Sequence, residues 1–452
     1  MTPKLPIYAT AILALVASLS GCKYDDSSSS AAPPAASSSF TIGGTVAGLA
    51  TGQQVTLLDN GANSLTLNAN GPFTFASSLS SSAAYGVTVG TQPNAEMCLV
   101  ASGSGTVGSS NVTNVAVSCA PVHNLYVSDS ANAQIFQYTI QANGTLVPVG
   151  SGVATAAGPS TGVAVDPVGP YLYATLYGSN SVEQFTIASN GSLTPMTTPT
   201  LSAGSSPYRD VVSPNGHFLF VGDNAGGSVT SYSIGINGAL TLIGTYTSSA
   251  GTNIQGLAVD PASTHLYVVG AQNSLIDAMT INSNGSLIDV GSISAGVTNP
   301  AYVTVDPTGT HLLTASHTSL GIFTITAGTG ALTFVSAPTV SGTGAMQLDF
   351  DPTGTHLYLG MEGSNTVDQF SWSAPTATPL SPAFVSLGAT QTAVWDATMD
   401  TTGQYYFTVN RNSKDISEFV VGTGGVLSAN PGGAVLTLPA SPIPDPYSVA
   451  VR

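Results

Sequence analysis

Residues 351–358 read DPTGTHLY, and a near copy, DPTGTHLL, occupies residues 306–313. In both copies an apolar run precedes the Asp-Pro pair, and a second apolar run follows the His. An Asp side chain caps a tight turn and Pro fixes φ within it, so each copy predicts two strands joined by a turn. The Asp-like position recurs at spacings of 45 to 49 residues, at Asp166, Ser213, Asp260, Asp306, Asp351 and Asp400.

Two further sequence patterns recur with the same period as the Asp-like turns: glycine-containing hairpin pairs and short apolar strands. Asn-Gly pairs favour tight type I′ hairpins because both residues tolerate positive φ. They recur 47 residues apart, at 143–144, 190–191, 237–238 and 284–285, and Thr-Gly pairs at 329–330 and 423–424 hold similar places. A short apolar strand also recurs seven times, near Leu125, Leu172, Leu219, Leu266, Leu312, Leu357 and Tyr406, and the last six copies each follow one of the turns. A period of about 40–50 residues with several strands per unit predicts the blades of a β-propeller.

The two ends of the repeat are incomplete in complementary ways. The strand near Leu125 has no inner strand before it, and the inner strand at 447–451 has no partner after it. We expect this last strand to close the ring beside the first blade, which removes an exposed edge. The predicted fold is all-β: a seven-bladed β-propeller over residues 122–452, preceded by a small Ig-like β-sandwich module over residues 40–120.

The small module is predicted from short β-prone runs separated by Gly, Asn and Ser. Cys98 and Cys119 lie 21 positions apart within it. In an exported protein we expect them to form a disulfide, and two buried free thiols are the alternative. Nothing in this module carries chemistry, so we interpret it as a spacer or adhesion-like unit.

Charge excludes some classes of partner. The chain of 452 residues has 6 Lys and Arg against 22 Asp and Glu, a formal net charge of −16. Binding of nucleic acid needs clustered cations, so no nucleic-acid partner is expected. Hydrophobic residues make up 42% of the chain, which excludes disorder throughout. The 50 Gly and 28 Pro agree with many turns and few long helices.

The N-terminus reads as an export signal. Lys4 precedes an apolar run of 13 residues, 7–19, which is too short to span a bilayer. The run ends in LSGC, which resembles a bacterial lipobox and implies lipidation of Cys22. An ordinary cleaved signal is the alternative. Residues 1–22 are thus the predicted signal peptide and lipobox, and residues 23–39 a flexible Ser/Ala/Pro tether. We expect an exported lipoprotein of the bacterial cell envelope, and Lys23 favours the outer membrane.

The repeats resemble those of the lactonase-like seven-bladed propellers, the 6-phosphogluconolactonase-type family. The likeness rests on the Asp-Pro-x-Gly-x-His-Leu-Tyr runs and on Ile-x-x-Asn-Gly-x-Leu hairpins such as 187–193, and it covers about 330 residues. It implies a propeller fold and a lactonase-type activity. The family's enzymes often carry Pro-Arg-His before a Ser-Pro-Asp-Gly turn, where this chain has Pro207-Tyr208-Arg209. Residues 122–452 hold four Lys or Arg against 18 acids, so a phosphosugar substrate is disfavoured and a neutral lactone stays an open alternative.

Candidate site residues come from aligning the second strands of the blades. His317, Glu362 and Arg411 fall at matched positions after these strands in blades five to seven. They form the candidate catalytic set, an acid–base pair with a cationic stabiliser, and solvated loop residues are the alternative. The candidate ligand-binding residues on the same face are Arg209, Trp395, Asp129 and Asp223.

Recurrent histidines invite a metal hypothesis, but they belong to separate blades. His217, His265, His311 and His356 are therefore predicted to serve turns rather than to share an ion. The sequence contains no metal-binding motif, and it predicts no cofactor. A divalent metal stays an open alternative.

The preferred interpretation is a lipid-anchored envelope propeller that acts as a binding or scaffold platform without catalysis. Its expected partners are the membrane, through Cys22, and an envelope protein, a glycan or a small neutral ligand. The alternative is a lactonase-type hydrolase of a neutral cyclic ester, and a third class is a passive surface array. A shared axial pocket for His317, Glu362 and Arg411 would favour the enzyme, because fold alone does not define function.

Overall fold

The computed structural model describes residues 38–452 apart from 92, 94, 95, 122, 142, 189, 433, 434 and 439–443. The predicted signal, lipobox and most of the tether, with Cys22, lie outside these residues. The regular secondary structure of the described residues consists of strands and two 3₁₀ helices, η1 (Tyr177–Ser179) and η2 (Thr423–Gly425). No helix in this part of the chain is long and apolar enough to cross a membrane.

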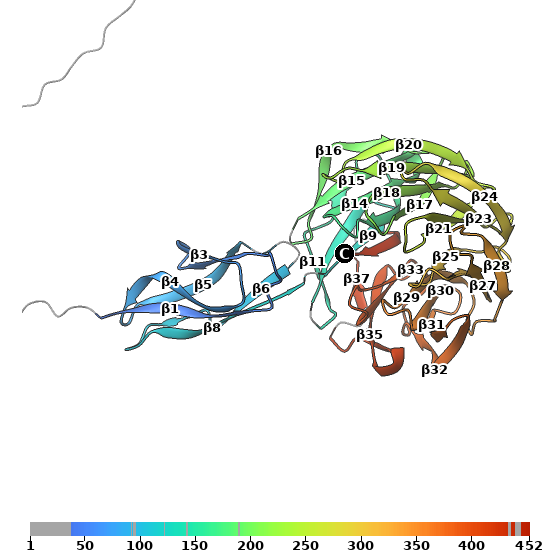
Figure 1. The fold of residues 1–452 in the computed structure, drawn as a ribbon. Helices are drawn as coiled ribbons and strands as arrows, with labels where there is room; N and C mark the ends of the chain where they lie inside the picture. The colour runs from blue at the N-terminus through green and yellow to red at the C-terminus, as the bar shows by residue number, and fades with distance from the viewer. Residues whose placement is uncertain are drawn as a thin grey trace, which may run out of the picture.

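The N-terminal module consists of two four-stranded sheets that share one core (Figure 1). One sheet has the order β4-β1-β8-β6 and the other β3-β2-β5-β7, and β1 pairs with β8 in parallel. The core is made by residues that alternate inward from both sheets, as in Phe75 and Leu57. The strands are β1 (Ser39–Ala47), β2 (Val55–Asp59), β3 (Asn63–Leu67), β4 (Gly71–Ser80), β5 (Ala84–Thr91), β6 (Glu96–Ala101), β7 (Ser104–Thr106) and β8 (Val112–Pro121).

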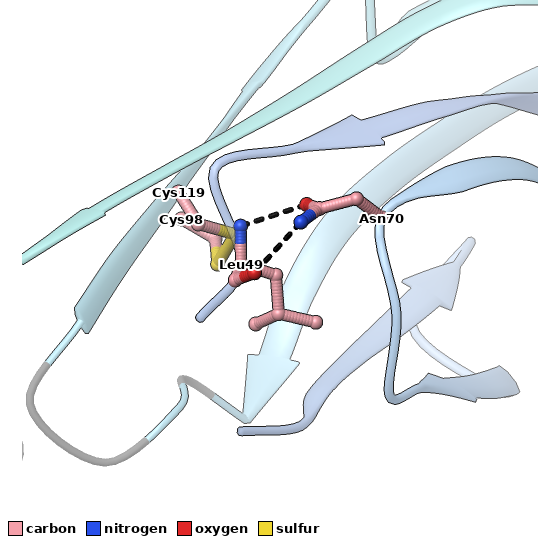
Figure 2. The surroundings of a disulfide bond; sticks show 4 residues. All are labelled: Leu49, Asn70, Cys98 and Cys119. Carbon is pink, nitrogen blue, oxygen red and sulfur yellow. Dashed lines mark hydrogen bonds between the residues drawn. A yellow bond between two sulfur atoms is a disulfide. The ribbon is translucent and has the colours of Figure 1, made fainter. Parts of the chain in front are cut away.

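The predicted disulfide between Cys98 and Cys119 is confirmed (Figure 2). The two cysteines lie directly opposite each other on β6 and β8. Beside them, the side-chain amide of Asn70 donates to Leu49 O at 2.7 Å and accepts from Leu49 N at 2.8 Å. Gly48, with φ +81°, runs so close to Cys119 that a Cβ would lie 2.0 Å from its carbonyl oxygen. The disulfide and Asn70 thus fix the chain where it leaves β1.

The described residues after this module form seven antiparallel sheets arranged in a ring, as predicted (Figure 1). Within blades two to seven the strands run outward from the axis in sequence order. Blades one to four contain β9 (His123–Asp129), β10 (Gln134–Ile140), β11 (Leu146–Pro148), β12 (Val153–Ala154), β13 (Ser160–Val165), β14 (Tyr171–Leu176), β15 (Ser181–Ile187), β16 (Leu193–Ser202), β17 (Pro207–Val212), β18 (Phe218–Asp223), β19 (Ser228–Ile234), β20 (Leu240–Thr247), β21 (Ile254–Val259), β22 (His265–Gly270), β23 (Leu275–Ile281) and β24 (Leu287–Ser294).

The remaining blades and the closing strand follow the same plan. They contain β25 (Tyr302–Val305), β26 (His311–Ala315), β27 (Leu320–Ile325), β28 (Leu332–Ser336), β29 (Ala345–Phe350), β30 (His356–Met361), β31 (Thr366–Ser373), β32 (Thr376–Ser386), β33 (Val394–Met399), β34 (Tyr405–Asn410), β35 (Asp415–Val421), β36 (Leu427–Ala429), β37 (Val435–Thr437) and β38 (Pro446–Val451). The C-terminal strand β38 pairs with β9 and supplies the inner strand of blade one, as expected (Figure 1).

The hairpin glycines also pack between blades. Tyr173 on β14 donates to Gly238 O in the next blade at 2.8 Å. A Cβ on Gly238 would lie 2.2 Å from the ring of Tyr171. The same Tyr-to-Gly hydrogen bond recurs at three further interfaces, for the pairs Tyr126–Gly191, Tyr267–Gly330 and Tyr358–Gly425. The apolar second strands therefore fill the space between blades, with a polar link at each of these interfaces.

The predicted type I′ geometry of the Asn-Gly hairpins is wrong. Gly238 and Gly285 have positive φ, whereas Asn237 and Asn284 do not. Gly285 N donates to Asn282 O and Asn282 N donates to Ser286 O, which makes a three-residue loop. The last residue of such a loop has a left-handed conformation, which favours Gly at that position. The Asn before it keeps its side-chain oxygen available, and Asn284 Oδ1 accepts a hydrogen bond from Ser286 N just before the next strand.

Three of the four recurrent histidines, His265, His311 and His356, contact the Asp of their own turn, as predicted. Asp351 Oδ1 accepts hydrogen bonds from Thr355 N and His356 N at 2.7 and 2.9 Å. His356 Nδ1 lies 3.2 Å from Asp351 Oδ2. Equivalent contacts join Asp260 with His265 and Asp306 with His311. Among the described residues no group of three His, Cys, Asp or Glu could hold a metal ion.

Candidate functional site

A β-bulge at the start of the inner strands builds the axial end of the propeller. The register shifts once between Pro207 and Arg209, so Tyr208 has no opposite residue on β18. A bulge turns its extra side chain away from the regular alternation. Equivalent shifts occur in other blades around Gln255, Met346 and Trp395, and an irregularity in β38 includes Tyr447.

These bulged residues line one pocket at the mouth of the axial channel, which we call the mouth pocket. It has a volume of about 290 Å³. The residues that follow three of these bulges, Arg209, Gln347 and Asp396, instead line a separate cavity further along the axis. The mouth pocket is lined by Tyr208, Asn253, Gln255, Ala271, Asn299, Pro300, Ala301, His317, Met346, Glu362, Trp395 and Tyr447.

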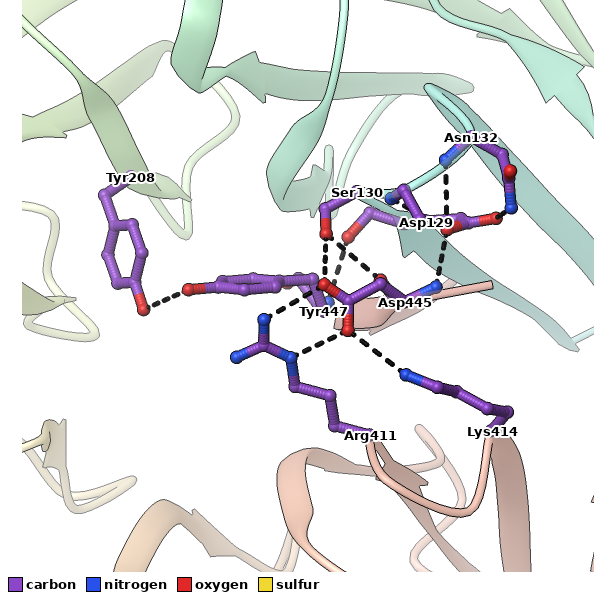
Figure 3. Close-up of polar contacts among 11 residues, drawn as sticks. Asp129, Ser130, Asn132, Tyr208, Arg411, Lys414, Asp445 and Tyr447 are labelled. Atoms are coloured by element: carbon purple, nitrogen blue, oxygen red, sulfur yellow. Dashed lines mark hydrogen bonds and ion pairs between the residues drawn. The ribbon is translucent and has the colours of Figure 1, made fainter. Parts of the chain in front are cut away.

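Three aromatic side chains, Tyr208, Trp395 and Tyr447, form a continuous wall of this pocket, and we call them the mouth aromatics. The ring of Tyr447 lies 5.7 Å from that of Tyr208 and 5.3 Å from that of Trp395. The hydroxyls of Tyr208 and Tyr447 are 2.6 Å apart (Figure 3). Flat apolar faces beside polar edges favour ring-shaped ligands that carry hydroxyl groups.

Arg411 lies behind the mouth aromatics rather than in the pocket. Its guanidinium stands 4.4 Å from the ring centre of Trp395 and 4.9 Å from that of Tyr447. It also forms a two-pronged ion pair with Asp445, at 2.8 and 3.0 Å (Figure 3). This cation is therefore already used to position the wall of the pocket.

His317 and Glu362 both line the mouth pocket and also a wider, shallower hollow of about 600 Å³ beside it. The backbone of Gly344 holds the two loops together. Gly344 N donates to His317 O at 2.8 Å, and Glu362 N donates to Gly344 O at 2.8 Å. The structure thus brings together two of the three candidate catalytic residues and leaves Arg411 outside both hollows.

Of the four candidate ligand-binding residues, one lines the mouth pocket and three lie elsewhere. Trp395 lines the mouth pocket, whereas Arg209 lies in the channel and pairs with Asp396 at 3.3 Å. Asp129 is fully buried and accepts from Asp445 N, Ala131 N and Asn132 (Figure 3).

Asp223, at the end of β18, has a structural role of the same kind. It is fully buried and accepts from the hydroxyls of Ser228 and Thr230 at 2.9 and 2.8 Å. Burial raises its pKa to about 6, although these hydrogen bonds oppose the shift. Asp129 and Asp223 therefore stabilise loops and do not reach the mouth pocket.

The channel behind the mouth is electrostatically unusual. The pKa of Asp210 and that of Asp349 are each raised to about 8, chiefly by burial and in part by the charge of Asp396. Burial also raises the pKa of Asp396, against the lowering effect of Arg209. This channel cavity has a volume of about 260 Å³.

Sequence reasoning missed most of the mouth pocket, including Tyr208, Gln255 and Met346. Aligning the inner strands, rather than the second strands, would have found them. Tyr208, Gln255, Ala301, Met346 and Trp395 follow one another at spacings of 45 to 49 residues. A left-handed residue also lies just before each of these inner strands, at Ser206, Asn253, Asn299, Gly344 and Ala393. Tyr447 and Asp445 carry no such signal, because they belong to the closing segment.

The comparisons with known proteins agree with this fold. The model of the lactonase family, seven-bladed β-propellers, matches residues 74–383. The chain therefore belongs to this family, whose propeller fold is that of the 6-phosphogluconolactonase-type proteins. The match starts within β4 of the N-terminal module and ends within β32, whereas the ring itself is closed by β38.

Several solved structures are similar to this chain over 73% of its length. A protein from Lactobacillus plantarum is 17% identical with a TM-score of 0.62, and the alignment covers 73% of this chain and 99% of that one. A candidate 6-phosphogluconolactonase from Bacteroides uniformis is 16% identical, with a TM-score of 0.59 and the same coverage. The periplasmic gluconolactonase of Pseudomonas aeruginosa is 15% identical, with a TM-score of 0.59 and again the same coverage. At these identities the likeness extends to the fold alone, and a search of curated proteins found no significant match.

Proposed function

We propose that the protein is a lipid-anchored envelope propeller that binds a small, neutral, hydroxyl-rich ring, such as a sugar or a sugar lactone, in its mouth pocket. The observation that carries this proposal is the wall of mouth aromatics beside amide and acidic side chains in one pocket. Aromatic faces cover the apolar face of a ring, and Asn253, Gln255, Asn299 and Glu362 offer hydrogen-bonding groups for its hydroxyls.

A neutral ligand is favoured over a phosphorylated one. Recognition of phosphate relies on cations that are free to bind it. Near the axis, Arg411 and Lys414 are already paired with Asp445, and Arg209 is paired with Asp396. The excess of acids over Lys and Arg in the propeller adds a repulsive field for phosphate.

A binding role is tested by the fluorescence of Trp395, because the chain has two tryptophans and only Trp395 lines the pocket. In a Trp372→Phe background, neutral sugars and lactones are titrated in parallel with the matching sugar phosphates. We expect saturable binding of a neutral ring and weaker binding of its phosphate. Binding that is equal or stronger for the phosphate would contradict the proposal.

Hydrolysis of a neutral lactone is the second candidate, because His317 and Glu362 line the same pocket. Either side chain could activate a water molecule to attack the ester carbonyl and open the ring. The test is the rate of lactone opening by the full chain and by Glu362→Gln and His317→Gln variants. Turnover that either substitution abolishes supports an enzyme. A rate of lactone opening with the wild-type protein that equals the uncatalysed rate contradicts hydrolysis and favours the binding role.

The lipid anchor is proposed from the lipobox at Cys22 and tested separately. In a bacterial host, we expect the wild-type protein to partition with membranes and a Cys22→Ser variant to become soluble after export. Membrane association that survives this substitution would show that Cys22 is not the anchor.

A further inference from the structure

The channel cavity along the propeller axis is lined by more acidic than basic side chains. Asp210 on β17, Asp349 on β29 and Asp396 on β33 all line it, and Arg209 is the cation among its lining residues. Arg209 pairs with Asp396 at 3.3 Å. No described Lys, Arg or His lies within ion-pair distance of Asp210 or Asp349. Buried charges that lack a partner are costly, so this excess calls for compensation.

The same cavity contains hydrogen-bond acceptors that have no donor among the described residues. They are Oδ2 of Asp210, Oε1 of Gln347 and Oδ2 of Asp349. The side chain of Gln347 is 97% buried, since the residue is 3% exposed, and it lines the cavity. Arg209 Nε also lacks a partner, but it belongs to the guanidinium that already pairs with Asp396.

Two of these acceptors belong to one strand and face the same way. Gln347 and Asp349 are two residues apart on β29, so their side chains share a face of the sheet. Gln347 Nε2 donates to Asp349 Oδ1 at 3.4 Å, which leaves Gln347 Oε1 and Asp349 Oδ2 open. Amide and carboxylate oxygens are the donor types that hard cations prefer.

We propose that the channel cavity binds one partly hydrated divalent cation of the oxygen-preferring class, Ca²⁺ or Mg²⁺, through Gln347 and Asp349. Asp210 and Asp396 lie too far for all the carboxylates to converge on one ion, in keeping with the lack of a three-residue acidic cluster. They reach the cation through water, for which a volume of about 260 Å³ leaves room. The cation offsets the two unpaired carboxylates and links blade six to blades three and seven.

Protons are the competing means of compensation, because burial raises the pKa of Asp210 and Asp349. The following experiment distinguishes binding of a divalent cation from protonation of the carboxylates. The full chain is stripped with a chelator, and thermal unfolding and calorimetric titration are followed with Ca²⁺ and Mg²⁺ against NaCl of equal ionic strength. We expect saturable binding of one divalent ion per chain and a rise in melting temperature that NaCl does not reproduce.

Four variants locate the site. Asp349→Asn and Gln347→Met each remove one proposed ligand at nearly constant volume, and we expect each to weaken binding by about 10- to 100-fold. Glu362→Gln in the mouth pocket and Asp289→Asn on the exposed part of β24 leave the affinity unchanged. No divalent-specific binding in the wild type overturns the proposal in favour of protons. Binding that survives both channel substitutions, or that is lost in Glu362→Gln, overturns it as well.

Discussion

The carboxylate of Glu418 accepts a hydrogen bond from the backbone N–H of Leu146 at 3.2 Å and so joins blade seven to blade one. At three other interfaces the equivalent acceptor is a glutamine amide: Gln137 accepts from Leu193 N, Gln184 from Leu240 N and Gln369 from Leu427 N. At the interface that closes the ring, the acceptor is therefore a buried carboxylate, whereas at these three other interfaces it is a neutral amide. Burial raises the pKa of Glu418 to about 7, although the hydrogen bonds from Leu146 and Asn430 oppose the shift.

Replacing Glu418 by Gln is therefore expected to stabilise the protein in alkaline solution. The folded state holds this proton more tightly than the unfolded chain, so the favourable contribution is complete below the ordinary pKa of 4.5 and is lost as the pH rises to about 7. Since a tenfold change in proton affinity is worth about 1.4 kcal/mol, we expect Glu418→Gln to gain about 1–3 kcal/mol at alkaline pH. The measurement is the free energy of unfolding as a function of pH.

The reverse substitution supplies the control. Gln369→Glu places an acid at the interface between blades six and seven, and we expect it to destabilise the protein increasingly as the pH rises. If Glu418→Gln is less stable than the wild type at alkaline pH, the carboxylate is not the costly element at this interface.

A hairpin glycine offers a test of packing between blades. Gly238→Ala meets two penalties, a φ of +76° and a Cβ that would lie 2.2 Å from the ring of Tyr171. The backbone penalty alone is about 1–2 kcal/mol, and we expect the clash to add about 1–3 kcal/mol as for an overpacked core. Gly328→Ala is the matched control, because Gly328 has φ +80° and open space around it. Equal losses of stability in the two variants would show that the glycine serves the turn alone.

The repeat made the fold predictable, because each blade carries the same turns at the same phase. The second-strand alignment also identified equivalent backbone positions: Glu362 N and Arg411 N each donate at 2.8 Å to the residue before the inner strand, Gly344 and Ala393. Blade five departs from this pattern because Ser316 N donates to Ser319 O in a tighter turn.

Other parts of the site have no such signal. The Arg411–Asp445 pair joins a blade to the closing segment, which has no counterpart elsewhere in the repeat. The hairpin error has a local cause, since Asn-Gly suits both a two-residue and a three-residue loop and the strand register selects between them.

The ion pair of Arg411 with Asp445 is expected to depend on the shape of the guanidinium. Arg411→Lys keeps the charge but loses the two-pronged contact and the stacking on Trp395 and Tyr447, so we expect a loss of about 1–2 kcal/mol in stability. Lys414→Gln is the control, because Lys414 meets the same carboxylate at only 3.4 Å and a partly exposed pair of this kind contributes about 1 kcal/mol or less. Chemical unfolding at neutral pH compares the two.

This contact also has a pH signature. Burial favours the neutral form of Asp445, but hydrogen bonds from Arg411 and Ser130 outweigh it and hold the pKa below its ordinary value of 3.8. The stabilisation is therefore present at neutral pH and is lost as the pH falls through and below that value. A difference between the wild type and Arg411→Lys that persists unchanged in strong acid would assign the loss to ring stacking instead.

Gly344 links the two acid–base candidates without itself carrying chemistry, and its substitution tests whether their relative placement matters. It has φ +76°, and a Cβ there would lie 2.8 Å from Gly363 N and 3.4 Å from Glu362 Cβ. We expect Gly344→Ala to displace the loop that carries Glu362 and to weaken the binding of a neutral ring ligand by about tenfold or more, since misplacement by about 1 Å costs activity heavily. Titration of Trp395 fluorescence in the Trp372→Phe background measures this affinity.

Gly424→Ala is the control. Gly424 also has a positive φ, at +74°, but it lies on a hairpin with open space around it, so we expect this variant to bind the ligand as the parent protein does. Equal affinity in the Gly344 and Gly424 variants would mean that the ligand does not contact the His317–Glu362 side of the mouth pocket.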